Sequence, residues 1–201
     1  MASQSLQNQY LSDPDVQLML KVSAGDNTAF EQLVRRYQDR LVGFFFYVIH
    51  DRSVCEDLAQ EAFLRVYKSR ERYEPTARFS TWLFRIAHNL ASNHKRGAAR
   101  RREIPHGSHT GDDDFRPQEK ILADKSALMP TRQLDSREIR DVVRSAVDEL
   151  TGGQRTAVIL HKFEEMSYEE IGEIMGLGTV AVKSLLSRAR RKLKEALEKY
   201  I

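Results

Sequence analysis

This chain of 201 residues is poor in the residue types on which several classes of protein depend. Its single cysteine, Cys55, excludes an internal disulfide and a cysteine-built metal site. A small buried thiol is the favoured interpretation of Cys55, and a redox sensor is the alternative. The six histidines do not recur at metal-ligand spacing on one helix face, and no glycine-rich phosphate loop or nucleophile elbow occurs. We therefore expect no catalytic residue, no metal and no cofactor, and an enzyme is the least favoured class.

Long apolar segments and strand-like patterns are also absent from the sequence. The longest apolar run, residues 41–49, is too short to cross a membrane, and no signal peptide is present. No segment alternates apolar and polar residues with the period of two that marks a half-buried strand. We therefore expect a cytoplasmic protein without membrane insertion, and an all-α fold.

Charge of one sign is not in excess, because 32 Lys and Arg residues nearly balance 29 Asp and Glu residues. The distribution is uneven, however: residues 89–102 hold five cationic side chains and no acid, and residues 183–194 hold six and no acid. Residues 103–124, between them, carry six acids and two bases. This alternation indicates two basic surfaces that bind a polyanion and an acidic connector that does not settle on either.

The pattern of residues 12–102 predicts a first helical domain. Asp26 is the expected N-cap of a helix that is apolar on more than one side, so this helix should lie at the centre of the domain. A further helix is predicted over residues 53–70, and Ser80 is the expected N-cap of the helix after it.

The helix predicted over residues 53–70 has an apolar stripe and a separate acidic face that includes one exposed leucine. The expected core stripe is Leu58, Ala62 and Val66, with Phe63 and Tyr67. The acidic face consists of Asp57, Gln60, Glu61, Leu64 and Lys68. Such a face is either ordinary solvent-exposed surface or a site that docks on a basic partner helix, with the leucine as a small apolar anchor.

The helix after Ser80 combines an apolar stripe, predicted to include Trp82, with a polar face that leads into a basic run. The polar face consists of Thr81, Arg85, His88, Asn89, Ser92, Asn93, Lys95 and Arg96, followed by Arg100, Arg101 and Arg102. Amides and hydroxyls can contact unpaired bases while cations hold the backbone, so this face suits single-stranded or distorted nucleic acid. Trp82 could stack on a base, but ordinary core packing is the favoured interpretation.

Helical periodicity disappears over residues 103–134, which contain several prolines and glycines and a run of three aspartates. A segment of this length is too long for a loop within a compact domain, so it is predicted to be a flexible acidic linker between two domains. Residues 135–201 then form a second small helical domain in which Asp135 and Glu138 begin the first helix.

Residues 167–193 predict a helix-turn-helix. Ser167 and Glu170 have capping-box spacing, Gly172 allows close helix packing, and Gly176 can adopt the left-handed turn. The second helix is expected to begin near Thr179. Its polar face carries Lys183, Ser184, Ser187, Arg188 and Arg191, a composition typical of a recognition helix. The alternative is an amphipathic helix with a solvated basic face.

Four sequence motifs in this order resemble the extracytoplasmic-function (ECF) group of bacterial sigma factors, which have only the second and fourth conserved sigma regions. The motifs are D-x-x-A-F-x-x-L-V-x-x-Y at residues 26–37, E-D-L-A-Q-E-A-F-L-R-V-Y at 56–67, F-S-T-W-L-F-R-I-A-H-N at 79–89, and S-R-A-R-R-K-L at 187–193. The resemblance implies a subunit that binds core RNA polymerase and promoter DNA and directs transcription initiation. Members of the group are commonly held inactive by an anti-sigma factor, which these residues neither identify nor exclude.

The resemblance assigns roles to three sets of residues. Core-polymerase binding falls to Asp57, Leu58, Gln60, Glu61 and Leu64. Promoter melting and minus-ten recognition fall to Trp82, Arg85, His88, Asn89 and Asn93, with Lys95 and Arg96 neutralising the backbone. Recognition of the minus-thirty-five element falls to Thr179, Lys183, Ser184, Ser187, Arg188 and Arg191.

The chain departs from the family pattern around the helix-turn-helix. Gly178, Val180 and Ala181 replace the usual serine cap, glycine or proline, and threonine, so the cap is expected to shift to Thr179. Leu185 stands where a second arginine is common, so one DNA contact is expected to be missing. Two rival interpretations remain: a stand-alone helix-turn-helix regulator, which would share residues 135–201, and a helical adaptor that has lost DNA recognition.

Overall fold

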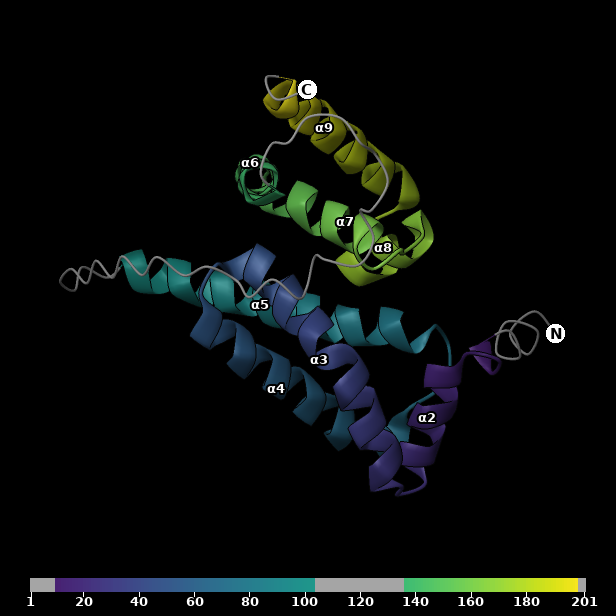
Figure 1. The fold of residues 1–201 in the computed structure, drawn as a ribbon. Coiled ribbons are helices and arrows are strands. Elements are labelled where there is room, and N and C mark those ends of the chain that lie inside the picture. The colour runs from purple at the N-terminus through teal and green to yellow at the C-terminus, as the bar shows by residue number, and fades with distance from the viewer. Residues whose placement is uncertain (1–9, 104–135, 199–201) are drawn as a thin grey trace.

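The computed structural model describes residues 10–103 and 136–198, and within these ranges it contains helices and no strand (Figure 1). The first group of elements is α2 (Pro14–Ser23), α3 (Asn27–Ile49), α4 (Arg52–Lys68), the 3-10 helix η1 (Arg70–Arg72) and α5 (Phe79–Glu103). The second group is α6 (Ser136–Asp148), α7 (Gly152–Lys162), α8 (Tyr168–Met175) and α9 (Thr179–Leu197). The predicted all-α fold is confirmed. The predicted linker lies outside the described residues except for Glu103, the last residue of α5.

Helix α3 lies at the centre of the first group, with α2, α4 and α5 packed around it. Asp26 caps it as predicted, accepting a hydrogen bond from the Ala29 amide at 3.1 Å. Its buried face is rich in aromatic rings, and Phe44 makes edge-on contacts with both Phe45 and Phe84. The apolar pattern that extends beyond one stripe therefore reflects packing on several sides.

Three predicted helix boundaries need correction. Helix α4 begins at Arg52 rather than Ser53, because Asp51 is the N-cap and accepts a hydrogen bond from the Val54 amide. It ends at Lys68, where the chain continues into a 3-10 turn. Helix α5 begins at Phe79, before the expected cap, because the Trp82 amide already donates to the Arg78 carbonyl at 3.2 Å.

The second group is organised around α7, which contacts α8 and α9, while α6 packs on α9. The main-chain N–H of Thr151 donates to the Gln154 side-chain oxygen at 3.2 Å, which stabilises the start of this helix. The helix Ser136–Asp148 is present, but Asp135 lies outside the described residues.

The two groups pack against each other. Helix α8 lies against α5, and α7 lies against α3 (Figure 1). Helix α9 lies on the side of the second group that faces away from α3 and α5. This arrangement leaves one of the two predicted DNA-binding helices open and places the other beside the domain interface.

Candidate nucleic-acid interface

The acidic face of α4 is present and does not belong to the core. Asp57, Gln60 and Leu64 are exposed, and Leu64 leaves 51% of its surface accessible. Glu61 is half-buried and accepts a hydrogen bond from Arg65 at 2.8 Å, one turn further on. An exposed leucine between acidic and amide side chains is suited to docking on a partner surface that carries cations around an apolar depression.

The buried stripe of α4 differs from the predicted one at its first position. Leu58 is only half-buried, whereas Cys55 and Ala59 lie in the core together with Ala62 and Val66. Burial raises the pKa of the Cys55 thiol to about 12, so the thiol stays protonated at neutral pH. A protonated, buried thiol is inert, and this geometry supports the structural interpretation of Cys55.

Helix α5 presents an exposed row of amide and cationic side chains. Arg85, Asn89, Asn93, Lys95 and Arg96 are exposed, and Arg96 donates to the Asn93 side-chain oxygen at 2.6 Å. The asparagines and Arg96 follow the spacing of one helix face, so they lie along one line. Such a row can offer both donors and acceptors to base edges while its cation contacts the backbone.

His88 lies at the edge of this row and is partly withdrawn from solvent. It is half-buried, and burial lowers its pKa, with the Lys95 charge acting in the same sense. The imidazole is therefore neutral at pH 7, and one ring nitrogen donates while the other accepts. A neutral His88 can hydrogen-bond a base, but it does not neutralise a phosphate.

Trp82 lies at the edge of the core rather than fully inside it. Its ring is half-buried, with centroids 4.9 Å from Tyr73 and 6.0 Å from Phe79. The Tyr73 hydroxyl beside it is buried without a hydrogen-bond partner. The core-packing interpretation of Trp82 is therefore right for one part of the ring, and the other part remains accessible for stacking.

The predicted helix-turn-helix is present in detail. The Ser167 amide donates to the Glu170 carboxylate at 2.8 Å, and the Glu170 amide donates to the Ser167 hydroxyl at 3.2 Å. Gly176 adopts the left-handed conformation with φ 66°. A side chain at Gly172 would lie 2.6 Å from the Leu177 carbonyl oxygen, so glycine there permits the turn to fold back on α8.

The recognition helix α9 begins differently from the prediction. Its N-cap is Gly178, and Thr179 is already the first helical residue, so the expected cap at Thr179 is wrong. Gly178 offers no side-chain oxygen, and the amides of Ala181 and Val182 instead donate to its carbonyl. The backbone can close this first turn by itself because the carbonyl of the capping residue remains available.

All six residues predicted for the minus-thirty-five element lie on the outward part of α9. Lys183, Ser187, Arg188 and Arg191 are exposed, as is Thr179, and Ser184 is half-buried. The opposite stripe, Val182, Leu186 and Ala189, is buried in the domain. The Arg188 guanidinium donates to the Ser184 hydroxyl at 2.8 Å, which places these two side chains together.

Leu185, which stands in the place of a common arginine, has a packing role. It is half-buried, and a side chain added at Gly153 would meet its methyl groups at 3.8 and 3.9 Å. Gly153 lies in the first turn of α7, so Leu185 packs beside the start of that helix, and an alanine at position 153 would make ordinary van der Waals contact with it.

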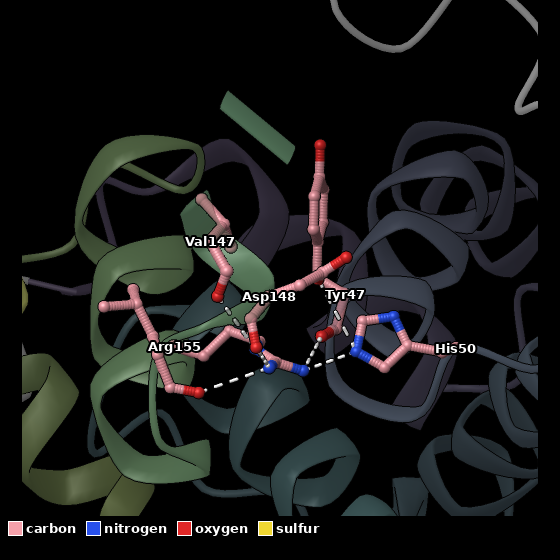
Figure 2. A network of polar contacts seen from close by, with 6 residues as sticks. Tyr47, His50, Val147, Asp148 and Arg155 are labelled. Atoms are coloured by element: carbon pink, nitrogen blue, oxygen red, sulfur yellow. Dashed lines mark hydrogen bonds and ion pairs between the residues drawn. The ribbon is translucent and has the colours of Figure 1, made fainter. Parts of the chain in front are cut away.

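An interdomain network joins the end of α3 to the second group (Figure 2). Arg155 of α7 donates to the main-chain carbonyls of Tyr47 at 3.3 Å and Val147 at 3.2 Å, and it also contacts His50. His50 has φ 66°, and its ring nitrogen lies 3.7 Å from the Asp148 carboxylate. No signal in the sequence identified this network, because its members are brought together only by the packing of α3 on α7.

A second set of interdomain contacts involves a buried carboxylate. Glu164 has a side chain that is only 5% exposed, and Arg40 of α3 donates to it from Nε at 2.9 Å. Burial raises the pKa of Glu164, and the Arg40 charge opposes that shift. Tyr47 and Phe163 stack beside this pair at 5.7 Å.

The domain interface reaches part of the polar face of α5. Thr81 is 2% exposed and donates to the Glu170 carboxylate at 3.2 Å, so it is unavailable to a ligand in this arrangement. A side chain at Gly152 would lie 3.8 Å from the Lys95 amine. Asn89, Asn93 and the whole outward face of α9 stay accessible.

Within residues 10–103 and 136–198, no cluster of side chains could hold a metal ion. In the same parts of the chain, no helix is long and apolar enough to cross a membrane.

Comparison with known proteins identifies the class. The family described as Sigma-70 region 2 matches residues 33–101, and Sigma-70, region 4, matches residues 140–193. The chain is 35% identical to the RNA polymerase sigma-H factor of Pseudomonas aeruginosa, covering 92% of this chain and 95% of that protein. It is 31% identical to the ECF RNA polymerase sigma-E factor of Escherichia coli K12, covering 93% and 96%. The chain therefore belongs to the sigma-70 family.

Within that family it is an ECF sigma factor, and as such it directs promoter-specific transcription by RNA polymerase. Two solved structures share the fold. CnrH in complex with the cytosolic domain of CnrY aligns with TM-score 0.65 at 24% identity over 94% of this chain and 100% of that one. RpoE in complex with the anti-sigma factor NepR from Bartonella quintana aligns with TM-score 0.67 at 23% identity, covering 86% and 98%. The region 2 match decides against a stand-alone regulator, which would share only residues 135–201.

Proposed function

We propose that this sigma factor divides its work between two modules. Residues 12–102 bind core RNA polymerase and melt the minus-ten element, residues 135–201 bind the minus-thirty-five element, and residues 103–134 connect them flexibly. The observation that carries the proposal is the presence of two separate polar faces, on α5 and α9, each backed by buried apolar residues of its own helix group. We expect no catalytic role, and the site of action is the bacterial cytoplasm, where the polymerase works.

Core polymerase docks on the acidic face of α4. Asp57 and Gln60 supply exposed polar groups, and Leu64 supplies the apolar anchor. Glu61 can bind a cation of the polymerase once its ion pair with Arg65 breaks. The ion pair between Glu61 and Arg65 is exposed and worth at most about 1 kcal/mol, so exchanging it for a partner cation costs little. Leu58 is half-buried beside this face, so it packs under the docking residues and is not the main apolar contact with the polymerase.

The minus-ten element is melted and read on α5. Unstacking and flipping a base costs a few kcal/mol, so the surface must return that free energy through contacts that exist only with separated strands. Asn89, Asn93 and the neutral His88 offer hydrogen bonds to exposed base edges, and Arg85 with Trp82 offers a plane on which a base can stack. Lys95 and Arg96 neutralise the backbone.

The minus-thirty-five element is read as duplex by α9 in the major groove. Arg188 and Lys183 can bond guanine edges or phosphates, while Ser184 and Ser187 can contact either. Thr179 lies at the start of the helix, and Arg191 lies further along the same face, where the DNA backbone crosses.

Neither DNA surface is large, so tight promoter binding requires both at once. Core polymerase holds the two modules at a fixed separation, which turns the second contact into an intramolecular event with a high effective concentration. The free chain therefore binds promoter DNA weakly. An anti-sigma factor that covers these faces fits the proposal, because members of the group are commonly held inactive in this way.

Run-off transcription tests the proposal. Purified core polymerase, the full chain and a pool of genomic promoter fragments should give specific transcripts. Reversing Asp57 and Glu61 together to lysine should abolish both the transcripts and the capture of core polymerase in a pull-down. The free chain on the selected promoter provides the baseline for weak binding.

The matched control reverses Glu31 and Asp39, two exposed acids of α3 that lie outside the proposed face. It makes the same change in net charge and should leave transcription intact. Equal loss in both double variants would show a general effect of charge, and full activity of the Asp57 and Glu61 variant would contradict docking on α4.

A further inference from the structure

Val180 is the most exposed large apolar side chain in the described parts of the molecule, with 82% of its surface accessible. It lies in the first turn of α9, directly after the turn of the helix-turn-helix. Burying an apolar side chain is favourable, so an isopropyl group left this exposed is available to contact a partner.

The position of Val180 identifies the surface to which it belongs. Ser184, Ser187 and Arg191 follow it at i+4, i+7 and i+11, which places all four on one face of the helix. Val182 and Leu186, which pack into the domain, lie on the opposite side. Val180 is therefore an apolar group at the N-terminal end of a face that is otherwise hydroxylic and cationic.

The charge of that face selects DNA as the occupant, and the chemistry of Val180 selects a particular group on it. N-terminal residues of a recognition helix reach base edges in the major groove. Among the groups that base pairs present there, the C5-methyl of thymine is the apolar one. The valine side chain has no donor or acceptor, so it gains nothing from the other base-edge groups.

We propose that Val180 reads the methyl group of a thymine in the minus-thirty-five element and so helps to set promoter specificity. The inference rests on the proposed function of α9 and adds a contact from a residue that stands where the family usually has glycine or proline. A contact from Val180 would also compensate for the DNA contact that is missing at Leu185, a residue that packs beside Gly153.

Deoxyuridine substitution provides the test, because deoxyuridine pairs like thymidine and lacks only the methyl group. A promoter fragment selected by run-off transcription is prepared with each upstream thymine replaced singly, and the affinity of the reconstituted holoenzyme is measured on each duplex. One replacement should weaken binding about fourfold, the factor expected for one methyl group removed from a buried contact. The Val180→Ala variant should bind thymine DNA more weakly and should show no further loss on that deoxyuridine duplex.

Lys183→Ala is the matched control on the same helix. It should lower affinity for the thymine and deoxyuridine duplexes alike and keep the fourfold methyl effect. Absence of a methyl effect in the unaltered protein, or an equal methyl effect in Val180→Ala, would overturn the inference. Weaker capture of core polymerase by Val180→Ala would also overturn it, since the valine would then contact protein. Failure of the proposed function itself would appear earlier, as a lack of transcripts before any deoxyuridine is introduced.

Discussion

The two domains bury their cores and present their DNA-facing helices in different ways. The first domain packs aromatic rings, with Phe44, Phe79 and Phe84 essentially inaccessible, and its α5 shows two amides, Asn89 and Asn93, among exposed cations. The second packs aliphatic chains such as Ile171 and Val182, and its α9 shows mostly cations and hydroxyls. The difference fits the proposed division of work, because separated strands expose base edges to amides whereas an intact duplex presents phosphates and groove edges.

The domains also differ in how accessible these helices are. Helix α9 faces away from the first domain, while α5 has Thr81 buried against Glu170 of α8. Duplex binding is therefore compatible with the packed arrangement. Full use of the α5 face requires the Thr81 end to separate from α8.

The largest expected effect is in the aromatic core. Phe84→Ala removes a fully buried ring that packs edge-on against Phe44 at 5.5 Å, and it should lower the free energy of unfolding by about 3–5 kcal/mol. Urea denaturation measures the change. Leu64→Ala, on the exposed face of α4, should shift stability by no more than about 0.5 kcal/mol while weakening capture of core polymerase. A loss below about 1 kcal/mol for Phe84→Ala would show that the core there is not close-packed.

The next effect falls on the turn of the second domain. Gly172→Ala places a methyl group 2.6 Å from the Leu177 carbonyl oxygen, so the turn must move, at a cost of about 1–3 kcal/mol. Binding of minus-thirty-five duplex should weaken with it. Gly97→Ala in α5 is the control: nothing lies within 4 Å, and alanine should stabilise the helix by about 0.5–1 kcal/mol. Equal stability of the two variants by urea denaturation would contradict the close approach at Gly172.

The interdomain network predicts a response to acid. Burial lowers the pKa of His50. The Asp148 carboxylate opposes this shift, and the charges of Arg155, Lys95 and Arg144 add to it. The contribution of His50 is therefore fully present above the ordinary histidine pKa of about 6.5 and is lost as the pH falls through that value toward the lower pKa of the packed state. Solution scattering should show the domains separating as the buffer is acidified.

His50→Asn is the control for this experiment. Asparagine tolerates the left-handed backbone at this position and does not titrate, so its domains should separate less on acidification. Glu164, whose pKa is raised by burial, acts in the opposite direction and is the same in both proteins. An identical response in the two proteins would show that protonation of His50 does not cause the domains to separate.

The smallest effect compares the two DNA-binding faces directly. Arg191→Ala should reduce the slope of log affinity against log salt by about 0.9 for duplex DNA, since one phosphate contact is lost. Asn89→Ala should weaken binding of melted promoter DNA by the holoenzyme with no change in slope, because an amide releases no counterion. Titrations at several salt concentrations measure both. A reduced slope for Asn89→Ala would mean that the two faces do not differ as described.

The sequence by itself determined the features that depend on near neighbours along the chain. Asp26 as a helix cap, the Ser167 and Glu170 capping box, the left-handed Gly176 and the buried stripe of α9 all follow from spacings of a few residues. Such spacings report helix geometry directly.

Tertiary structure decided what depends on residues far apart. Phe79 belongs to the helix that was expected to begin after it, and its ring is buried in the core. Gly178 caps α9 through its backbone where a side-chain cap was expected. The contacts of His50 with Arg155 and of Arg40 with Glu164 join residues more than a hundred positions apart. Charge and periodicity cannot reveal such pairs, because they exist only once the two helical groups pack against each other.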